Sequence, residues 1–474
     1  MTIKFGTDGW RAVISETFTF NNLRLVAQAI ADYVLEEEST RPSVVVGFDT
    51  RFLSDRYAAE VARVMAANGI ETWLARADTP TPAVSYAIVD KRATAGVMVT
   101  ASHNAPRYNG VKLKASYGGS ASPQQSKRVE QLLERNLRNA HGPNLMDLEQ
   151  AIEEERIHKF DPSWAYYEHL STLVDLDTIH SAELRVVADG MYGSGRGVIG
   201  EVLARGRTYV LNIRHEMNPG FGGIHPEPIE RHLGLLMSTI QAGHFSAGLA
   251  TDGDADRIGA VDALGCFVDP HRIFALVLRY LVEKRRLEGQ VVRTVSTTRM
   301  IDRIAARHAL PVVETPVGFN HIADLMLANG VLMGGEESGG MSIKHHIPEG
   351  DGILMALLLL EVMADAGEPL HVLVEDLLQE YGPAEYQRID LKLSQPIAKA
   401  EMVRMLQETA PARVDGVNIE KVDTIDGVKY YLDDGSWLLI RPSGTEPVLR
   451  VYAEAPSRDR VAALLRFGEE VARR

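Results

Sequence analysis

Short apolar runs alternate with amphipathic stretches along most of this chain. Apolar residues at helical spacing predict a helix over Asn22–Leu35, and the same pattern recurs at Asp55–Asn68 and Pro82–Val89. Uninterrupted apolar runs between these helices predict buried strands at Val44–Asp49, Ile70–Leu74 and Gly96–Val99. Strands that alternate with helices of this length are typical of βαβ units and a parallel sheet.

The alternation restarts twice further along the chain. After a boundary at His141-Gly142-Pro143, the next strands are predicted at Leu184–Ala188, Thr208–Ile213 and Ala247–Ala250. A third block begins near Val268, with strands at Val291–Val295, Pro311–Glu314 and Val331–Met333. The final block differs, because few helices separate its predicted strands, which are Tyr386–Leu393, Lys429–Leu432, Trp437–Arg441 and Val448–Glu454. We expect an α+β module with an antiparallel sheet there.

Composition narrows the class of protein. The 474 residues carry a formal net charge of −14, which argues against nucleic acid or an anionic membrane as partner. The longest apolar run, Ile353–Met363, contains Glu361 and is too short to span a bilayer, so it predicts a buried core helix. The only cysteine is Cys266, so no disulfide can form within the chain, which suits a reducing compartment. The N-terminus lacks the apolar segment of a signal peptide. We therefore expect a cytoplasmic protein.

A candidate reactive serine follows one of the predicted strands. Strand Gly96–Val99 ends in Thr100-Ala101-Ser102-His103-Asn104, and ligands of open α/β sheets sit at the carboxyl ends of strands. Alone, Ser102 is better explained as a turn residue. His103 does not make a hydrolase-type pair with it, because neighbours on an extended loop point apart, and the chain has neither a G-x-S-x-G nor a G-x-x-x-x-G-K-[ST] motif.

Three carboxylates predict a metal site. Asp252, Asp254 and Asp256 are spaced two residues apart, so an extended segment would turn them to one side, and hard oxygen ligands favour magnesium or calcium. An EF-hand is excluded because its sixth and twelfth positions would be Arg257 and Ala263. An acidic surface loop is the alternative. Since predicted buried strands flank the triplet, we favour a magnesium ion shared with a phosphate.

Two further loops carry polar chemistry. Arg441–Pro447 combines a guanidinium, two hydroxyls and a glycine, as an anion-binding turn requires, and Arg450 adds charge nearby; a hairpin turn explains the same residues. Glu336-Glu337-Ser338 follows a predicted strand and could hydrogen-bond sugar hydroxyls, although acidic turns are common.

A glycine motif supports a rival function. Gly195–Gly200 matches G-x-G-x-x-G after a strand, and Glu216 lies about 20 residues on, as in dinucleotide-binding folds. This pattern would indicate a nicotinamide-dependent oxidoreductase. We rank it lower because Arg196 interrupts it and because it explains neither the aspartates nor the serine loop.

Taken together, the loops resemble one family, the α-D-phosphohexomutases, which contains phosphoglucomutase, phosphomannomutase and phosphoglucosamine mutase. The matching segments occur in family order over nearly the whole chain: FGTDGWR at 5–11, TASHN and YNGVK within 100–112, NPGFGGIHPEP at 218–228, DGDADR at 252–257, GEESGG at 335–340 and RPSGTEP at 441–447. The resemblance implies three similar α/β domains with mixed, mostly parallel sheets and a C-terminal α+β domain around a central cleft, at residues 1–145, 146–265, 266–375 and 376–474.

The resemblance also implies roles for residues. Ser102 would carry a phosphoryl group, and Mg²⁺ would be held by Ser102, Asp252, Asp254 and Asp256. Arg11 and Lys112 would flank the reacting phosphoryl group, with Arg257 nearby. Sugar hydroxyls would bind Glu336 and Ser338, and the distal phosphate would bind the loop with Arg441, Ser443, Gly444 and Thr445. The implied reaction interconverts hexose 1-phosphate and hexose 6-phosphate through a hexose 1,6-bisphosphate, which also acts as activator.

The chain departs from the family at three basic positions, which are Asn320, Gly340 and Gly350 here. The general base is therefore unassigned. Lys344, His345, His346 and His321 are candidates, although each is better explained as a surface residue or as one that supports the site without touching the substrate. His103 and Arg450 are further site residues. We expect glucose phosphates, and mannose phosphates besides, as substrates of a monomer or small homo-oligomer. A sugar-phosphate binder without catalysis is the remaining alternative.

Overall fold

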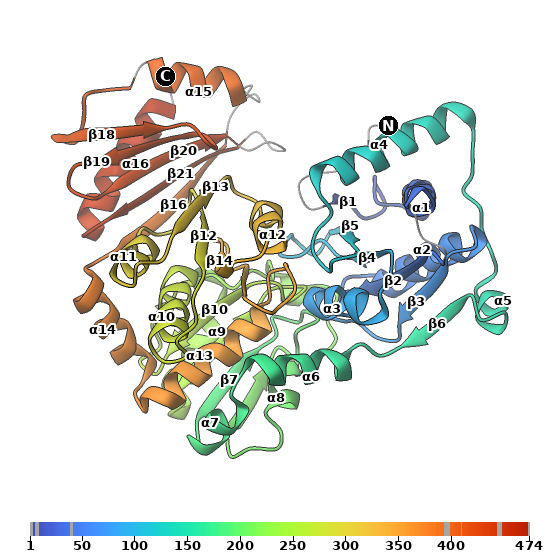
Figure 1. The fold of residues 1–474 in the computed structure, drawn as a ribbon, viewed down its shortest axis with the longest axis horizontal. Helices are drawn as coiled ribbons and strands as arrows, with labels where there is room; N and C mark the ends of the chain where they lie inside the picture. Colours follow the sequence, from blue (N-terminus) through green and yellow to red (C-terminus); the bar gives the residue numbers. More distant parts are fainter. Residues whose placement is uncertain are drawn as a thin grey trace.

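The computed structural model describes residues 3–4, 9–37, 41–392, 399–408, 410–442 and 448–472. Within these residues four sheets follow one another along the chain, three of them mixed and the last antiparallel. In Figure 1 the first sheet lies at the right, the second at the bottom, the third near the centre and the fourth at the upper left. The predicted class, three α/β units followed by an α+β unit, is confirmed.

The first sheet has the strand order β1-β5-β4-β2-β3-β6. Parallel pairing joins β2 to β3, β2 to β4 and β3 to β6, whereas β5 runs antiparallel to β4 and β1. The strands are β1 (Trp10–Val13), β2 (Ser43–Phe48), β3 (Glu71–Ala75), β4 (Ala95–Val99), β5 (Tyr108–Ala115) and β6 (Ile157–Phe160). Because β6 joins this sheet, the first unit extends past the expected boundary at residue 145.

Helices cover both faces of the first sheet. Val44 and Val46 of β2 share a core with α1 (Phe20–Glu36), α2 (Ser54–Ala67) and α4 (Pro123–Asn139), whereas Val45 packs against α3 (Thr81–Lys91). This alternation is the period of two expected of a strand buried on both faces. The short helix α5 (Leu148–Glu153) precedes β6.

The second sheet has the order β11-β10-β9-β7-β8. Strands β8 and β9 run parallel to β7, and the hairpin strands β10 and β11 are antiparallel. The strands are β7 (Arg185–Asp189), β8 (Tyr209–Ile213), β9 (Ala247–Thr251), β10 (Ile258–Asp262) and β11 (Phe267–Val268); the helices are α6 (Ser163–Leu173), α7 (Leu176–Ser181), α8 (Val198–Val202) and α9 (Gly234–Gly243). Helix α9 covers one face of this sheet, and the other face joins the core of the third unit.

The third sheet has the order β13-β12-β14-β15. Its strands are β12 (Gln290–Thr294), β13 (Val312–Thr315), β14 (Val331–Gly335) and β15 (Met341–Ile343); the helices are α10 (Pro270–Glu283), α11 (Met300–Arg307), α12 (Phe319–Leu327), α13 (Gly352–Ala366) and α14 (Leu370–Tyr381). Helix α13 contains the apolar run Ile353–Met363, and all of that run is buried, as predicted. Its one charge, Glu361, pairs with Arg285 and accepts a 2.7 Å hydrogen bond from Tyr280, because a buried carboxylate needs partners.

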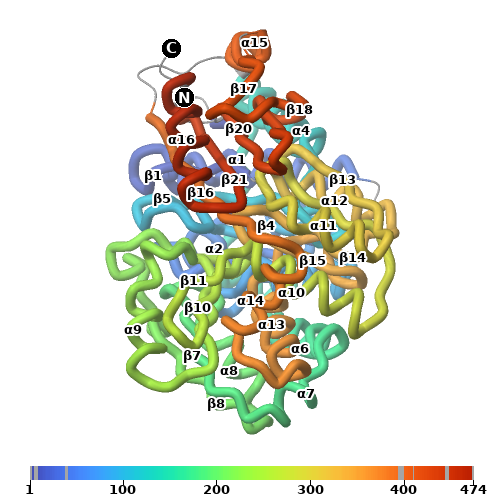
Figure 2. The backbone as a smooth tube through the Cα atoms, turned by 90° about the vertical axis from the view of Figure 1, so that its left-hand side faces the viewer, coloured from blue at the N-terminus to red at the C-terminus, as the bar shows by residue number. Residues whose placement is uncertain are grey.

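The fourth sheet is antiparallel, with the order β16-β21-β20-β19-β18-β17. Its elements are β16 (Glu385–Lys392), α15 (Lys399–Glu408), β17 (Arg413–Val414), β18 (Val417–Asp423), β19 (Val428–Leu432), β20 (Trp437–Pro442), β21 (Val448–Ala455) and α16 (Arg458–Ala472). In the side view of Figure 2 the fourth unit (orange to red) and the second (green) lie at opposite ends, with the third beside them. No helix in the described part of the chain is both long and apolar enough to cross a bilayer.

Candidate active site

The serine loop leaves the carboxyl end of β4, as the sequence predicts. Ser102 is fully buried and adopts a left-handed backbone with φ of 52°, which is uncommon for a residue other than glycine. Its amide donates to Thr100 Oγ1 at 2.8 Å, and its hydroxyl donates to Asp252 Oδ2 at 2.9 Å. Ser102 and the aspartate triplet, 150 residues apart in sequence, are therefore in direct contact.

One residue that the sequence analysis missed holds this loop. Arg51 is buried, and its NH2 group donates to the carbonyls of Ser102 and Asn104, both at 2.6 Å. Its Nε lies 3.1 Å from Asp49 Oδ2, and burial raises the pKa of Asp49 to about 6 despite that pairing. The available signal was Asp49-Thr50-Arg51, polar residues at the end of buried strand β2, which lies beside β4 in the sheet.

The three aspartates converge after β9. One carboxylate oxygen from each lies within 4.8 Å of the others, and all three residues are buried. The segment is a turn with Ala255 in a left-handed conformation, so the expectation of an extended segment was wrong. The three carboxylates nevertheless converge, as expected. Burial, followed by the charges of Asp256 and Asp254, raises the pKa of Asp252 well above its ordinary value. Such a cluster requires a counter-charge.

Protein cations supply part of that charge. Lys112 on β5 places its Nζ 2.9 Å from Asp254 Oδ2 and 2.8 Å from Asp256 Oδ2. Although burial acts to raise it, the pKa of Asp254 lies below its ordinary value because of Lys112. Arg257 approaches Asp256 Oδ1 at 3.7 Å, and Arg11 on β1 donates to Asn104 of the serine loop at 2.8 Å.

His103 also lines the cleft beside Ser102, with its Nδ1 at 3.3 Å from Ser102 Oγ. Burial lowers the pKa of His103 well below its usual value, and the charges of Arg257 and Arg11 lower it further. The imidazole is therefore neutral at physiological pH. Although Ser102 and His103 are sequence neighbours, their side chains do not point apart as predicted.

Close packing explains the glycines of these loops. A Cβ on Gly253 would lie 2.4 Å from the carbonyl oxygen of Ser102, and one on Gly195 would lie 2.6 Å from Thr251 Oγ1. The Gly195–Gly200 motif thus packs against the aspartate loop and leads into a helix, α8, of five residues. Arg196 within it donates to Asp78 of the first unit at 2.9 Å. These contacts account for the motif without a dinucleotide.

The Glu336–Ser338 loop follows β14 and reaches the cleft. Glu336 Oε1 accepts a 2.8 Å hydrogen bond from the amide of Gly318, and burial raises the pKa of Glu336 to about 7. The three positions at which the resemblance leads one to expect basic residues, Asn320, Gly340 and Gly350, all line the same cleft. At Gly350 a side chain would be crowded, because its Cβ would lie 2.8 Å from the carbonyl oxygen of Asp256.

The proposed general bases lie elsewhere. Lys344, His345 and His321 are not among the residues that line the cleft. The side chain of His346 is fully buried, with Nε2 at 2.9 Å from Asp351 Oδ2 and Nδ1 at 2.9 Å from His169 Nε2. His346 therefore does not line the cleft. Its proximity in sequence to the Glu336 loop did not reveal that its ring turns into the core.

Arginines mark the opposite wall of the cleft, on the fourth unit. Arg441 on β20 and Arg450 on β21 are direct cross-strand partners, a like-charge arrangement that is unfavourable unless an anion is near. Arg441 Nε donates to Asp426 Oδ2 at 2.7 Å, and Arg450 Nε lies 4.0 Å from Asp390 Oδ2. The predicted Ser443, Gly444 and Thr445 lie outside the described residues.

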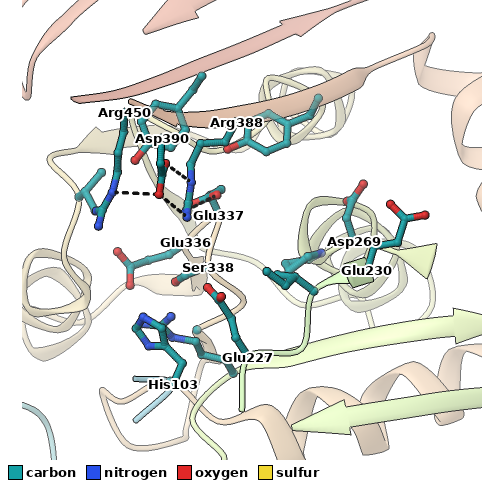
Figure 3. Close-up of a pocket in the computed structure, with 18 of the residues that line it drawn as sticks. His103, Glu227, Glu230, Asp269, Glu336, Glu337, Ser338, Arg388, Asp390 and Arg450 are labelled. Atoms are coloured by element: carbon teal, nitrogen blue, oxygen red, sulfur yellow. Dashed lines mark hydrogen bonds and ion pairs between the residues drawn. The ribbon is translucent and has the colours of Figure 1, made fainter. Parts of the chain in front are cut away.

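All four units contribute to one cleft of 1980 Å³. Its lining includes Arg11 and His103 from the first unit, Arg257 from the second, Glu336 from the third and Arg450 from the fourth. In Figure 3 His103, Glu227, Glu336 and Ser338 face a common space, with Arg388 and Arg450 above them. Basic groups therefore lie at two ends of a cavity with carboxylates between them, an arrangement suited to a ligand with two anionic ends.

Family models match the chain in four consecutive pieces. The models of phosphoglucomutase/phosphomannomutase match as alpha/beta/alpha domain I at residues 2–140, domain II at 164–265, domain III at 269–381 and the C-terminal domain at 397–467. These matches cover most of the chain in the order in which the four sheets occur.

Similar proteins span almost the full length. A protein of Thermococcus kodakarensis named phosphoglucomutase/phosphomannomutase is 29% identical over 98% of this chain and 97% of its own. A probable phosphoglucosamine mutase of Methanopyrus kandleri is 31% identical over 97% of this chain and 95% of its own. The crystal structure of a putative phosphomannomutase from Thermus thermophilus superposes with a TM-score of 0.86 at 32% identity, covering all of both chains.

Proposed function

The chain belongs to the phosphoglucomutase/phosphomannomutase family, and we propose that it interconverts hexose 1-phosphate and hexose 6-phosphate through phosphorylated Ser102. One observation carries the assignment of the serine: its hydroxyl lies 2.9 Å from Asp252, and the adjacent His103 lines the cleft to which all four units contribute. The named relatives are phosphohexomutases, so catalysis is favoured over sugar-phosphate binding alone or nicotinamide chemistry.

The aspartates fit a divalent cation. Asp254 Oδ1 and Asp256 Oδ1 are buried and have no hydrogen-bond partner in the described part of the chain, and Asp252 is buried beside them. Three carboxylate oxygens within 4.8 Å of one another are hard ligands that suit a cation such as Mg²⁺. We propose that Asp252, Asp254, Asp256 and the phosphate of Ser102 would hold Mg²⁺, which would supply charge neutralisation for the phosphoryl group.

The transfer itself depends on positioning and charge neutralisation. The bond between Ser102 Oγ and phosphorus breaks as the free hydroxyl of a hexose 1-phosphate forms its own bond to phosphorus, and the proton lost by that hydroxyl is balanced by the proton gained at Ser102 Oγ. Arg11, Lys112 and Arg257 lie around the serine and the aspartates and would balance the charge of the phosphoryl group. The resulting hexose 1,6-bisphosphate turns over in the cleft and returns its other phosphoryl group to Ser102. In that return step, the Ser102 hydroxyl proton is directed at Asp252 Oδ2.

The remaining groups would hold the part of the substrate that does not react. We assign the distal phosphate to Arg441 and Arg450 with the adjoining loop, because a dianion between them relieves their mutual repulsion. Glu336 and Ser338 lie between the two anion-binding ends and would bind sugar hydroxyls. The same distal phosphate site can bind the bisphosphate in either orientation, because both ends of the bisphosphate carry a phosphate group.

For the sugar, we propose glucose, with mannose as a second substrate, and a cytoplasmic enzyme activated by the matching hexose 1,6-bisphosphate. Glucosamine is the competing sugar, because relatives named phosphoglucosamine mutase match over nearly the whole length. A coupled assay with glucose, mannose and glucosamine 1-phosphates, each primed with its bisphosphate and magnesium, decides among them. Turnover of none of the three contradicts the proposed function.

A further inference from the structure

The guanidinium of Arg388 ties the loop of Glu336, Glu337 and Ser338, called here the sugar-binding loop, to the fourth unit. Glu337 lies between Glu336 and Ser338, and its side chain reaches Arg388, whereas the two neighbours face the common space of the cleft (Figure 3). Arg388 NH1 on β16 donates to Glu337 Oε1 at 3.1 Å. The same guanidinium lies 3.0 Å from Asp390 Oδ1 through Nε and 3.3 Å from Oδ2 through NH2. The planar guanidinium of Arg388 thus joins a carboxylate of the third unit to a carboxylate of the fourth.

The ion pairs continue from Arg388 toward Arg450, one of the two arginines assigned to the distal phosphate. Asp390 and Arg450 are direct partners across β16 and β21, and Arg450 Nε lies 4.0 Å from Asp390 Oδ2. Figure 3 shows the resulting row of contacts from Arg450 through Asp390 and Arg388 to Glu337. The sugar-binding loop and the distal anion site are therefore connected by consecutive ion pairs.

A second connection runs parallel to the first. Arg441 donates to Asp426 Oδ2 at 2.7 Å, and the amide of Val317 donates to the same oxygen at 3.0 Å. The next amide, that of Gly318, donates to Glu336 at 2.8 Å. Two adjacent carboxylates of one loop are thus each linked to one of the two cross-strand arginines.

The Glu337–Arg388 contact has the properties of a geometric constraint. Its side chains are only 15% and 27% exposed, so solvent screens the pair less than it would a surface salt bridge. Burial alone would raise the pKa of Glu337, but Arg388 and His271 hold that pKa below its ordinary value. Glu337 is therefore ionised at physiological pH. The guanidinium also lies over the Tyr452 ring, 5.9 Å from its centroid, which restricts the orientation of the guanidinium plane.

We propose that Glu337 and Arg388 are positioning residues, which fix Glu336 and Ser338 at a set distance from Arg441 and Arg450. This inference rests on the proposed function, in which the substrate contacts both groups at once. Loss of the bridge leaves each set of contacts intact but lets the loop shift relative to the arginines. Affinity for a hexose phosphate then falls, whereas affinity for inorganic phosphate, which spans neither Glu336 nor Ser338, does not.

The test compares Glu337→Gln, Arg388→Lys and the double variant. Lysine keeps the charge but cannot hold two carboxylates in one plane. Asp415→Asn is the matched control, because it breaks a 2.8 Å ion pair with Arg460 within the fourth unit and away from the bridge. Calorimetry gives Kd for inorganic phosphate and for glucose, mannose and glucosamine 6-phosphates, and kinetics give KM and kcat for whichever sugar is turned over.

We expect each single variant to bind the preferred hexose phosphate about tenfold more weakly, and the double variant to be no weaker than the poorer single, because all three break one interaction. Kd for inorganic phosphate stays within about twofold, and Asp415→Asn matches the unmodified protein. Unchanged hexose phosphate affinity, or losses that multiply in the double variant, overturn the proposal. An equal loss for inorganic phosphate also overturns it, since Arg388 would then be a phosphate ligand.

These measurements distinguish a failure of the proposed mutase function from a failure of the proposed role of Glu337 and Arg388. If the unmodified protein binds a hexose phosphate but isomerises none, the mutase function fails and the binding measurements still decide whether the bridge couples the two sites. If it isomerises a sugar and the variants bind that sugar normally, only the coupling fails. A protein that binds no hexose phosphate contradicts both.

Discussion

Gly253→Ala tests the close approach of the serine loop to the aspartate loop. The added Cβ would lie 2.4 Å from the carbonyl oxygen of Ser102 and 3.1 Å from Pro226 Cγ, whereas ordinary contact begins at 3.4 Å. The two loops must therefore separate by about 1 Å. A 1 Å misplacement of reacting groups costs about 10²-fold in rate, equivalent to about 2.7 kcal/mol of barrier. Overpacking of this kind lowers the free energy of unfolding by about 1–3 kcal/mol.

The assay measures kcat for hexose phosphate isomerisation together with thermal unfolding. Gly234→Ala is the matched control, because its Cβ would meet no atom within 4 Å. We expect kcat to fall about 10²-fold for Gly253→Ala at temperatures where the variant is folded, and to be unchanged for Gly234→Ala. A folded Gly253→Ala protein with kcat within about threefold of normal would refute the view that contact between these two loops is needed for transfer.

Two further predictions follow from charge. Removing divalent metal with a chelator should abolish turnover, and Mg²⁺ should restore it; turnover that survives exhaustive chelation contradicts the proposed metal site. Glu336 has a pKa of about 7 in the folded protein and 4.5 ordinarily, so its protonated form favours folding, and that contribution is complete below pH 4.5 and lost as pH rises through 7. The Tm of the unmodified protein, measured relative to that of Glu336→Gln, should therefore fall as pH rises from 4.5 to 7. A difference in Tm that does not change with pH contradicts a pKa of Glu336 raised by burial.

Periodic segments could be predicted from sequence because their own residues determine them. The apolar runs that became β2, β4 and β9 are buried on both faces, and Ile353–Met363 could only be a core helix. The candidate site followed from them in part, since Ser102 and Asp252 come directly after buried strands and strand ends gather ligands.

Features set by distant partners could not be predicted from sequence. Arg51 acts on carbonyls more than fifty residues away, and Arg388 meets Glu337 across 51 positions, so no local pattern indicates either contact. Gly195–Gly200 carries a dinucleotide signature that close packing against Thr251 explains equally well. His346 illustrates the converse, a titratable residue near the site in sequence whose ring is buried elsewhere.

The central claim is that Ser102 carries the transferred phosphoryl group. Incubation with hexose 1,6-bisphosphate labelled at phosphorus, followed by peptide mapping, tests it most directly. We predict label on Ser102 alone, lost to hexose 1-phosphate in a single turnover, and no label in a folded Ser102→Ala variant. Label at another residue, or an unlabelled protein that still isomerises its substrate, would contradict the account.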